Sequence, residues 1–276
     1  MMQHDAFHRR FESGLDALAG LPMEAARRRY DTLCASFAPA DPPGMAVSDG
    51  HIEGVGVRYF HPAVDAEVAP ILYAHGGGWN LGSPRSHHGI AADLAERLGR
   101  EVISVDYRLA PEASYAEALD DCRRVAEACS PIALVGDSAG GRLVMDVARQ
   151  SHRHGVLGLI YPPVGRPTPD TLGPDAPLLS RADILALWDS IADDVPMPDA
   201  TSAPGESIEV LAVEHDPLTR PLEATIDGWR RDGADIGYRC APGMLHGALH
   251  AHAELPSMYD AWRDFCRALG QRLPRT

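Results

Sequence analysis

The feature that most constrains the fold of this chain is a regular alternation, beginning at residue 71, of short apolar stretches with segments of helical length. Apolar stretches this short, flanked by turn residues, are typical of buried strands. Strands that alternate with helices form βαβ units, which build a mostly parallel sheet covered on both faces. The predicted strands are 71–75, 102–107, 132–136, 157–161, 208–214 and 236–240, and the predicted helices are 87–99, 115–129, 140–153, 219–232 and 255–270.

Two regions depart from this alternation. Residues 4–37 predict two helices separated by Gly20-Leu21-Pro22, and two antiparallel strands are expected around 44–50 and 52–61. Between 161 and 208 the chain is rich in proline and holds one short helical pattern, at 182–192. We interpret residues 1–43 as an N-terminal helical cap and 44–276 as the main α/β domain, with a short cap insertion at about 163–205.

The charge balance excludes several function classes. The formal net charge is −14, and all 25 basic residues are arginine. An acidic surface repels phosphate backbones and anionic lipids, so we expect neither nucleic acid nor a membrane as a partner. The absence of lysine excludes a lysine Schiff base, a P-loop lysine and a Ser–Lys dyad.

The cysteines and the N-terminus indicate a cellular compartment. The five cysteines are odd in number and show no metal-site spacing, so we interpret them as buried thiols of a reducing compartment. Residues 1–10 are polar and charged, unlike a signal peptide, and no apolar run approaches the roughly 20 residues that span a bilayer. We therefore expect a soluble, cytoplasmic protein.

One predicted strand leads directly into a candidate nucleophile. Residues 136–140 read Gly-Asp-Ser-Ala-Gly and are followed by a predicted helix. This is the G-x-S-x-G pattern in its strand–turn–helix context, where the tight turn exposes the serine hydroxyl and points a helix N-terminus at it. A Gly-rich helix start or a phosphate cradle is the alternative. We take Ser138 as the candidate nucleophile.

A second glycine-rich segment, His75-Gly76-Gly77-Gly78-Trp79, follows the first strand of the alternation. Its backbone N–H groups can approach a ligand oxygen closely, and we expect Gly76 and Gly77, with Ala139, to stabilise an oxyanion. A dinucleotide-binding loop fits poorly, because the G-x-G-x-x-G spacing fails. We expect His75 to fix the loop by a hydrogen bond.

A serine hydroxyl needs a base, and the base needs an orienting acid. Asp216 and His246 follow the last two predicted strands, at the sheet edge where Ser138 is also expected. Glu214 and His215 are weaker candidates, since Glu214 lies within its strand and His215 points away from Asp216.

We assign no metal site to the remaining histidines. His246 and His250 are four residues apart, but the glutamate of a zinc-protease helix is missing between them. We interpret His250 and His252 as surface or helix-capping residues and His87 and His88 as solvated side chains.

Taken together, these segments resemble the hormone-sensitive-lipase-like family of α/β-hydrolase esterases. The resemblance extends from about residue 70 to 250. The matching segments occur in the family's order and are 75–79, Asp106-Tyr107-Arg108-Leu109-Ala110-Pro111-Glu112, 136–141, Asp216-Pro217-Leu218 and 242–247.

The resemblance implies an α/β-hydrolase fold with an eight-stranded, mostly parallel sheet and a small helical cap, so that 44–276 is the catalytic domain. It implies hydrolysis of small short-acyl esters without a cofactor, and it supports the triad Ser138, Asp216 and His246. The segment 106–112 is expected to tie loops beneath the site. A homodimer is also expected, because related esterases often form one.

Four further residues are candidates for contacting the substrate: Trp79, Asp137, Arg142 and Ala248. Arg142 stands where the family usually has Asn, and Ala248 where a large aromatic residue is common. Arg142 could bind an acidic substrate group or form a surface ion pair.

Two alternatives stay open at this point. The same triad would serve an amide, N-acetyl or N-formyl hydrolase. A non-catalytic ligand receptor can share this fold, although such receptors lack the catalytic histidine that His246 provides here.

Overall fold

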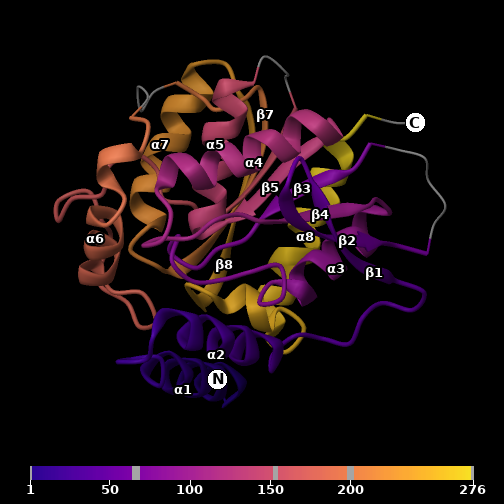
Figure 1. The fold of residues 1–276 in the computed structure, drawn as a ribbon. Coiled ribbons are helices and arrows are strands. Elements are labelled where there is room, and N and C mark those ends of the chain that lie inside the picture. The colour runs from indigo at the N-terminus through magenta and orange to yellow at the C-terminus, as the bar shows by residue number, and fades with distance from the viewer. Residues whose placement is uncertain (1, 64–68, 152–154, 198–201, 275–276) are drawn as a thin grey trace.

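An eight-stranded sheet forms the centre of the molecule in the computed structural model, which describes residues 2–63, 69–151, 155–197 and 202–274 (Figure 1). Its strand order is β1-β2-β4-β3-β5-β6-β7-β8. β2 pairs antiparallel with β1 and β4, and all the other pairs are parallel, so the predicted mostly parallel sheet is confirmed. The strands are β1 Ala46–Ile52, β2 Val55–His61, β3 Ile71–Ala74, β4 Val102–Asp106, β5 Ala133–Asp137, β6 Val156–Ile160, β7 Ser207–His215 and β8 Asp235–Leu245.

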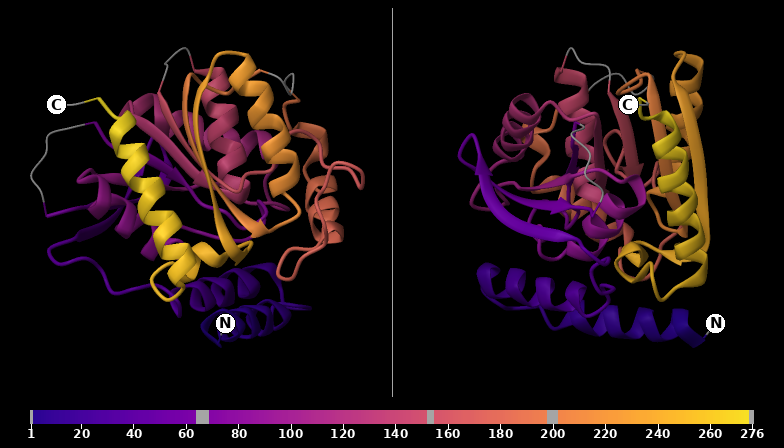
Figure 2. Two further views of the ribbon diagram at one scale, coloured as in Figure 1. Left: turned by 180° about the vertical axis from the view of Figure 1, so that it is seen from behind. Right: turned by 90° about the vertical axis from the view of Figure 1, so that its right-hand side faces the viewer.

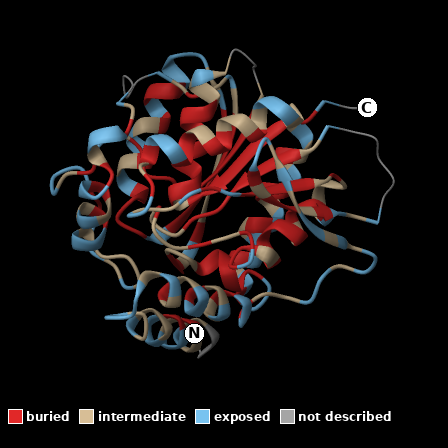
Figure 3. Cartoon of the chain, viewed as in Figure 1, coloured by how far each residue is buried: buried red, intermediate tan, exposed pale blue. Residues whose placement is uncertain are grey.

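Helices cover both faces of the sheet. Side chains of β3 point alternately to two apolar clusters, Tyr73 to one and Leu72 to the other. The first cluster includes α3 (His88–Leu98) and α8 (Pro256–Arg272), and the second includes α4 (Tyr115–Cys129), α5 (Ser138–Gln150) and α7 (Thr219–Arg231). Buried residues accordingly concentrate on the strands and the inner helix faces (Figure 3).

The two N-terminal helices, α1 (Met2–Asp16) and α2 (Met23–Ala35), lie side by side across one end of the molecule (Figure 2). The break predicted at Gly20-Leu21-Pro22 separates them. Phe11 of α1 stacks on His250, which follows β8, and Tyr30 of α2 contacts the same ring from its edge. The helices therefore cover the chain that leaves the carboxyl end of β8.

The proline-rich segment between β6 and β7 also lies against the strand ends. Its helix α6 (Arg181–Asp189) begins with a capping box of Ser180 and Asp183 and is followed by the short η1 (Ala192–Asp194). Ile184 packs against Leu218, just after β7. The predicted helix 182–192 is thus shorter in the structure.

The last strand is longer than the sequence predicted. β8 continues to Leu245, whereas the apolar pattern ends near residue 240, because Pro242 and Gly243 interrupt the alternation. The backbone still pairs with β7 through a register shift, which places Leu245 opposite His215. β8 therefore delivers the chain directly to His246.

Two further sequence expectations can be compared with the structure. All five cysteines are free; Cys34, Cys122 and Cys266 are buried, but Cys129 and Cys240 are only partly buried. Among the described residues, no helix combines the length and the apolar character that a bilayer crossing requires.

Candidate active site

Ser138 lies at the junction of β5 and α5. Its φ is +50°, in the left-handed region that non-glycine residues rarely adopt. The turn is so tight that a Cβ on Gly136 would lie 2.6 Å from the backbone carbonyl of Gly140. Strained backbone of this kind costs about 1–3 kcal/mol and persists only where the surrounding structure enforces it. The turn places the hydroxyl at the end of a central strand, at the N-terminus of α5.

A continuous hydrogen-bonded line joins the three residues that the sequence singled out. His246 Nδ1 donates to Asp216 Oδ2 over 2.7 Å, and Ser138 Oγ lies 2.9 Å from His246 Nε2. Because the carboxylate accepts the proton of Nδ1, Nε2 is free to accept the proton of the hydroxyl. The Asp216 side chain is fully buried and the imidazole is 13% exposed.

Adjacent strands bring the acid and the base together. Asp216 directly follows β7, and His246 directly follows β8, its parallel neighbour. The other oxygen of Asp216, Oδ1, accepts the N–H of Leu218 over 2.9 Å, so both carboxylate oxygens are held. Glu214 and His215 lie within β7 and are exposed, and Glu214 accepts the N–H of Gly243. The structure thus places neither Glu214 nor His215 in the hydrogen-bonded line from Asp216 to Ser138.

Tyr161 is a site residue that the sequence analysis missed. Its ring centroid lies 4.5 Å from that of His246, and its φ is +34°. The side chain is buried at the carboxyl end of β6, one strand from β5. The signal available in the sequence was its position, since other site residues also directly follow a strand.

The expectation for Gly76 as an oxyanion donor must be corrected. Its N–H donates to Asp137 Oδ1 over 2.9 Å, so it points to the carboxylate behind Ser138. The carbonyl of Gly76 accepts His75 Nδ1–H over 2.8 Å, as expected of a loop-fixing histidine. The sequence could not reveal this engagement, because it depends on how close β3 and β5 lie.

The N–H groups of Gly77 and Ala139 remain candidates. Gly77 has a φ of +116°, which favours glycine, and in the described chain its N–H has no protein partner. Ala139 lies in the first turn of α5, where backbone N–H groups lack helical acceptors and the helix dipole favours negative charge.

The sequence suggested that Asp137 and Arg142 contact the substrate, but in the structure both side chains are buried and bonded to other protein groups. Asp137 is buried and accepts hydrogen bonds from Tyr73, Gly76 and His87. Arg142 is 1% exposed, and its Nε donates to Asp146 Oδ2 over 2.8 Å. The ion pair is therefore buried and not on the surface, because both residues lie on the inner side of α5, one turn apart.

Trp79 and Ala248 are buried beside the candidate site. The Trp79 ring packs edge-on against Trp188 of α6 and Tyr115 of α4, with centroids 6.2 and 6.0 Å apart. Ala248 begins the short helix η2 (Ala248–Ala251), two residues after His246. Contact between either residue and the substrate remains a prediction.

The Arg and Glu of segment 106–112, expected to tie loops, form ion pairs with helices instead. Arg108 pairs with Asp121 of α4, and Glu112 pairs with Arg27 of α2. The same Arg27 donates to the carbonyl of Asn80, so α2 is bonded to the chain that follows the glycine-rich loop.

The expectation that His87, His250 and His252 are solvated or at the surface is wrong. They are 1%, 5% and 1% exposed. Phe11 and Tyr30 of the cap pack on the His250 ring, which itself lies 4.6 Å from the His87 ring, and His252 packs against Trp262 of α8. The side chain of His88 is 26% exposed and contacts Asp41. Despite these histidines, no group of three or more His, Cys, Asp or Glu side chains in the described ranges could hold a metal ion.

A cavity of about 290 Å³ lies on the outer side of Asp216, between α1 and the segment before α6. It is lined by His4, His8, Pro174, Asp175, Ala176, Pro177, Glu214, His215, Asp216 and Leu245. This volume lies near the lower end of ligand pockets, which span about 300–1,000 Å³.

Comparison with known proteins agrees with this geometry. The family model described as alpha/beta hydrolase fold matches residues 71–250. Carboxylesterase NlhH of Mycobacterium tuberculosis is 31% identical over 235 residues, covering 74% of this chain and 73% of the relative. Esterase LipI of the same organism is 32% identical over 258 residues, covering 83% of this chain and 78% of the relative.

Solved structures share the fold. The structure of DphMB1 is 28% identical with a TM-score of 0.77 and covers 93% of both chains. A hormone-sensitive lipase from a metagenome library has a TM-score of 0.83 at 21% identity and covers 99% of both chains. The second likeness concerns the fold alone.

Proposed function

Since this chain belongs to the hormone-sensitive-lipase-like family of α/β-hydrolase esterases, we propose that it is a serine carboxylesterase that hydrolyses small short-acyl esters through an acyl-enzyme intermediate. The observation that carries the proposal is the line from Asp216 through His246 to Ser138, with distances of 2.7 and 2.9 Å. The division into an N-terminal cap (1–43) and a catalytic domain (44–276) is part of the same proposal.

In the first step, Ser138 Oγ attacks the ester carbonyl while His246 Nε2 takes the hydroxyl proton. Asp216 stays ionised, keeps the ring proton on Nδ1 and stabilises the imidazolium that forms. His246 then returns the proton to the departing alkoxide, which leaves an acyl group on Ser138. In the second step, a water molecule that gives its proton to the same imidazole hydrolyses this acyl-enzyme.

The negative charge that develops on the carbonyl oxygen needs donors in place before the reaction. We assign this role to the N–H groups of Gly77 and Ala139, since the N–H of Gly76 is bonded to Asp137. Donors fixed by the fold cost no reorganisation during the reaction, and removing one such donor typically lowers kcat by about 10²–10³-fold.

A small substrate is supported by the packing of α6 around the glycine-rich loop. The Trp79 ring at the end of that loop packs edge-on against Trp188 of α6. A Cβ on Gly78 would lie 2.9 Å from the Leu187 side chain of α6, so the insertion leaves little space there.

The test is Ser138→Ala, assayed with 4-nitrophenyl acetate. We expect turnover to fall by at least about 10⁴-fold while circular dichroism shows a folded protein, because the nucleophile is lost and the core is untouched. Ser13→Ala, on the exposed side of α1, is the matched control and should retain the wild-type rate.

A Ser138→Ala variant that hydrolyses the ester at the wild-type rate would refute the assignment. Stoichiometric labelling of wild-type Ser138 by a fluorophosphonate rejects a non-catalytic receptor. Rates on N-acetyl and N-formyl substrates above the rate on 4-nitrophenyl acetate would favour amide hydrolysis by the same residues.

A further inference from the structure

A buried carboxylate lies directly behind the nucleophile. Asp137 precedes Ser138, and its side chain is 4% exposed. It accepts hydrogen bonds from the Tyr73 hydroxyl over 2.5 Å, the Gly76 N–H over 2.9 Å and His87 Nε2 over 3.3 Å. Burial raises the pKa of this carboxyl, but the His87 charge and the hydrogen bonds from His87 and Tyr73 outweigh it, so the pKa is lowered. Asp137 is therefore a carboxylate at neutral pH.

This carboxylate fixes the first glycine of the glycine-rich loop. The N–H of Gly76 donates to Asp137 Oδ1 over 2.9 Å and also faces His87 Nε2 at 3.3 Å, and the carbonyl of Gly76 accepts His75 Nδ1–H. A Cβ on Gly76 would lie 2.4 Å from Asp137 Oδ2, so loop and carboxylate are in direct contact. Both peptide planes that flank Gly76 are thus anchored.

The second of these planes contains the N–H of Gly77. In a trans peptide the carbonyl of one residue and the N–H of the next point in opposite directions. Because His75 holds the Gly76 carbonyl on one side, the Gly77 N–H points to the other. A rotation of Gly76 would therefore turn the donor that we assign to the oxyanion.

His87 contacts Asp137 and Gly76 from outside the loop and the strands. Its ring is buried just before α3, and Nδ1 lies 2.8 Å from Ser86 Oγ. Nε2 lies 3.3 Å from both Asp137 Oδ2 and the backbone nitrogen of Gly76. The neighbouring His250 ring lies 4.6 Å away, and burial, with the charge of His87, lowers the pKa of His250 to about 3. His250 is therefore neutral at pH 7.

We propose that His87 is a positioning residue, which acts through Asp137 and Gly76 to direct the Gly77 N–H at the oxyanion. This inference rests on the proposed esterase function, because an oxyanion forms only if Ser138 attacks a carbonyl. His87 touches neither Ser138 nor the substrate in this scheme. Its effect should appear in the transition state and not in the binding of the ester.

The test compares two polar replacements of similar size. In His87→Gln the amide nitrogen can occupy the place of Nε2 and still donate to Asp137. In His87→Asn the amide reaches only the place of Nδ1, near Ser86, and the donor to Asp137 is lost. We expect His87→Asn to lower kcat by about 10–100-fold, less than the loss of a whole donor, with KM within about threefold. His87→Gln should retain kcat within about threefold.

A second measurement separates positioning from stability. Fluorophosphonate titration run to completion counts the competent sites, so that kcat is expressed per folded molecule. A trifluoromethyl ketone, which forms a tetrahedral adduct with the serine, should lose affinity in His87→Asn in parallel with kcat/KM.

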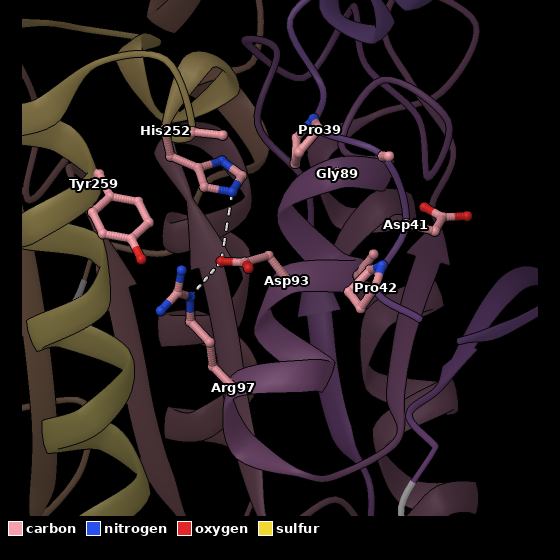
Figure 4. A pocket seen from close by; sticks show the side chains of 11 residues that line it. Pro39, Asp41, Pro42, Gly89, Asp93, Arg97, His252 and Tyr259 are labelled. Atoms are coloured by element: carbon pink, nitrogen blue, oxygen red, sulfur yellow. Dashed lines mark hydrogen bonds and ion pairs between the residues drawn. The ribbon is translucent and has the colours of Figure 1, made fainter. Parts of the chain in front are cut away.

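The matched control is His252→Gln, at a second buried histidine that faces an aspartate. His252 lies beside a small cavity between α3 and α8, where its Nε2 is 3.5 Å from Asp93 (Figure 4). We expect this variant to lower stability without lowering kcat per titrated site.

Three outcomes would overturn the proposal: a kcat per titrated site of His87→Asn within about twofold of wild type, equal losses in His87→Asn and His87→Gln, or an equal loss in His252→Gln. Each differs from failure of the proposed function, in which the wild-type protein itself would hydrolyse no ester.

Discussion

Two aspartate–histidine pairs lie at different places in this fold and do different things. Asp216 and His246 meet after neighbouring strands, and the second imidazole nitrogen reaches Ser138. Asp93 of α3 and His252 meet between helices (Figure 4). The second nitrogen of His252 donates to the carbonyl of Leu249.

The two pairs differ in the group that the second imidazole nitrogen of the histidine contacts. Asp93 also accepts the indole N–H of Trp262 and a hydrogen bond from Arg97, so that pair is the centre of a structural network. An aspartate and a histidine in contact therefore do not by themselves indicate catalysis. The first pair differs because it lies at the edge where the strands end and its histidine contacts the nucleophile Ser138.

The largest expected effect separates the pairs by activity. Asp216→Asn should lower kcat by about 10⁴-fold, because the amide no longer fixes the ring proton on His246 Nδ1. Asp93→Asn should leave kcat per competent site within about twofold. Steady-state kinetics with 4-nitrophenyl acetate measures both. Comparable losses in the two variants would erase the distinction.

The next effect separates them by stability. Asp93→Ala leaves the buried indole N–H of Trp262 and the ring of His252 without their acceptor, and unsatisfied groups of this kind cost about 1–3 kcal/mol. We expect the free energy of unfolding, from urea titration, to fall by that amount. Asp216→Asn keeps the size of the side chain and should cost less. A greater loss of stability in Asp216→Asn would contradict the comparison.

The third effect concerns acid and is measured as the slope of stability against pH. Burial lowers the pKa of His250, packed beside the site, to about 3, and it also lowers the pKa of His252 in the second pair. Between about pH 6.5 and pH 3 the unfolded chain binds protons that the folded chain refuses, so stability falls as pH falls. His250→Gln should make this decline shallower by up to about one proton, or about 1.4 kcal/mol per pH unit. Identical slopes in urea titrations of the two proteins would refute the expectation.

The pattern of residues along the chain was sufficient to predict the helices and strands and their order. The alternation from residue 71 onward predicted the strands and helices within a few residues, and the break at Gly20-Leu21-Pro22 separated α1 from α2. The predicted end of a strand was wrong where the local residue pattern and the pairing of strands disagree. β8 continues past Pro242 because a neighbouring strand, and not the local sequence, provides its hydrogen bonds.

The site shows the same division. The sequence singled out Ser138 by the G-x-S-x-G pattern after a predicted strand, and Asp216 and His246 by their chemistry and their positions after the last two predicted strands. It gave Gly76 a donor role, although Asp137 already accepts that N–H. It also treated His87 as solvated, because no local pattern reports that the rings of Tyr73, His75 and His250 pack around it.

What the sequence alone determined is the set of chemical groups and their order along strands and turns, since periodicity, glycine positions and residue type are local properties. Only the tertiary structure decided which N–H groups are already engaged, which histidines are buried and which aspartate serves which imidazole. Those outcomes depend on distances of a few ångströms between segments far apart in the chain, because a hydrogen bond forms only when donor and acceptor meet within about 3 Å.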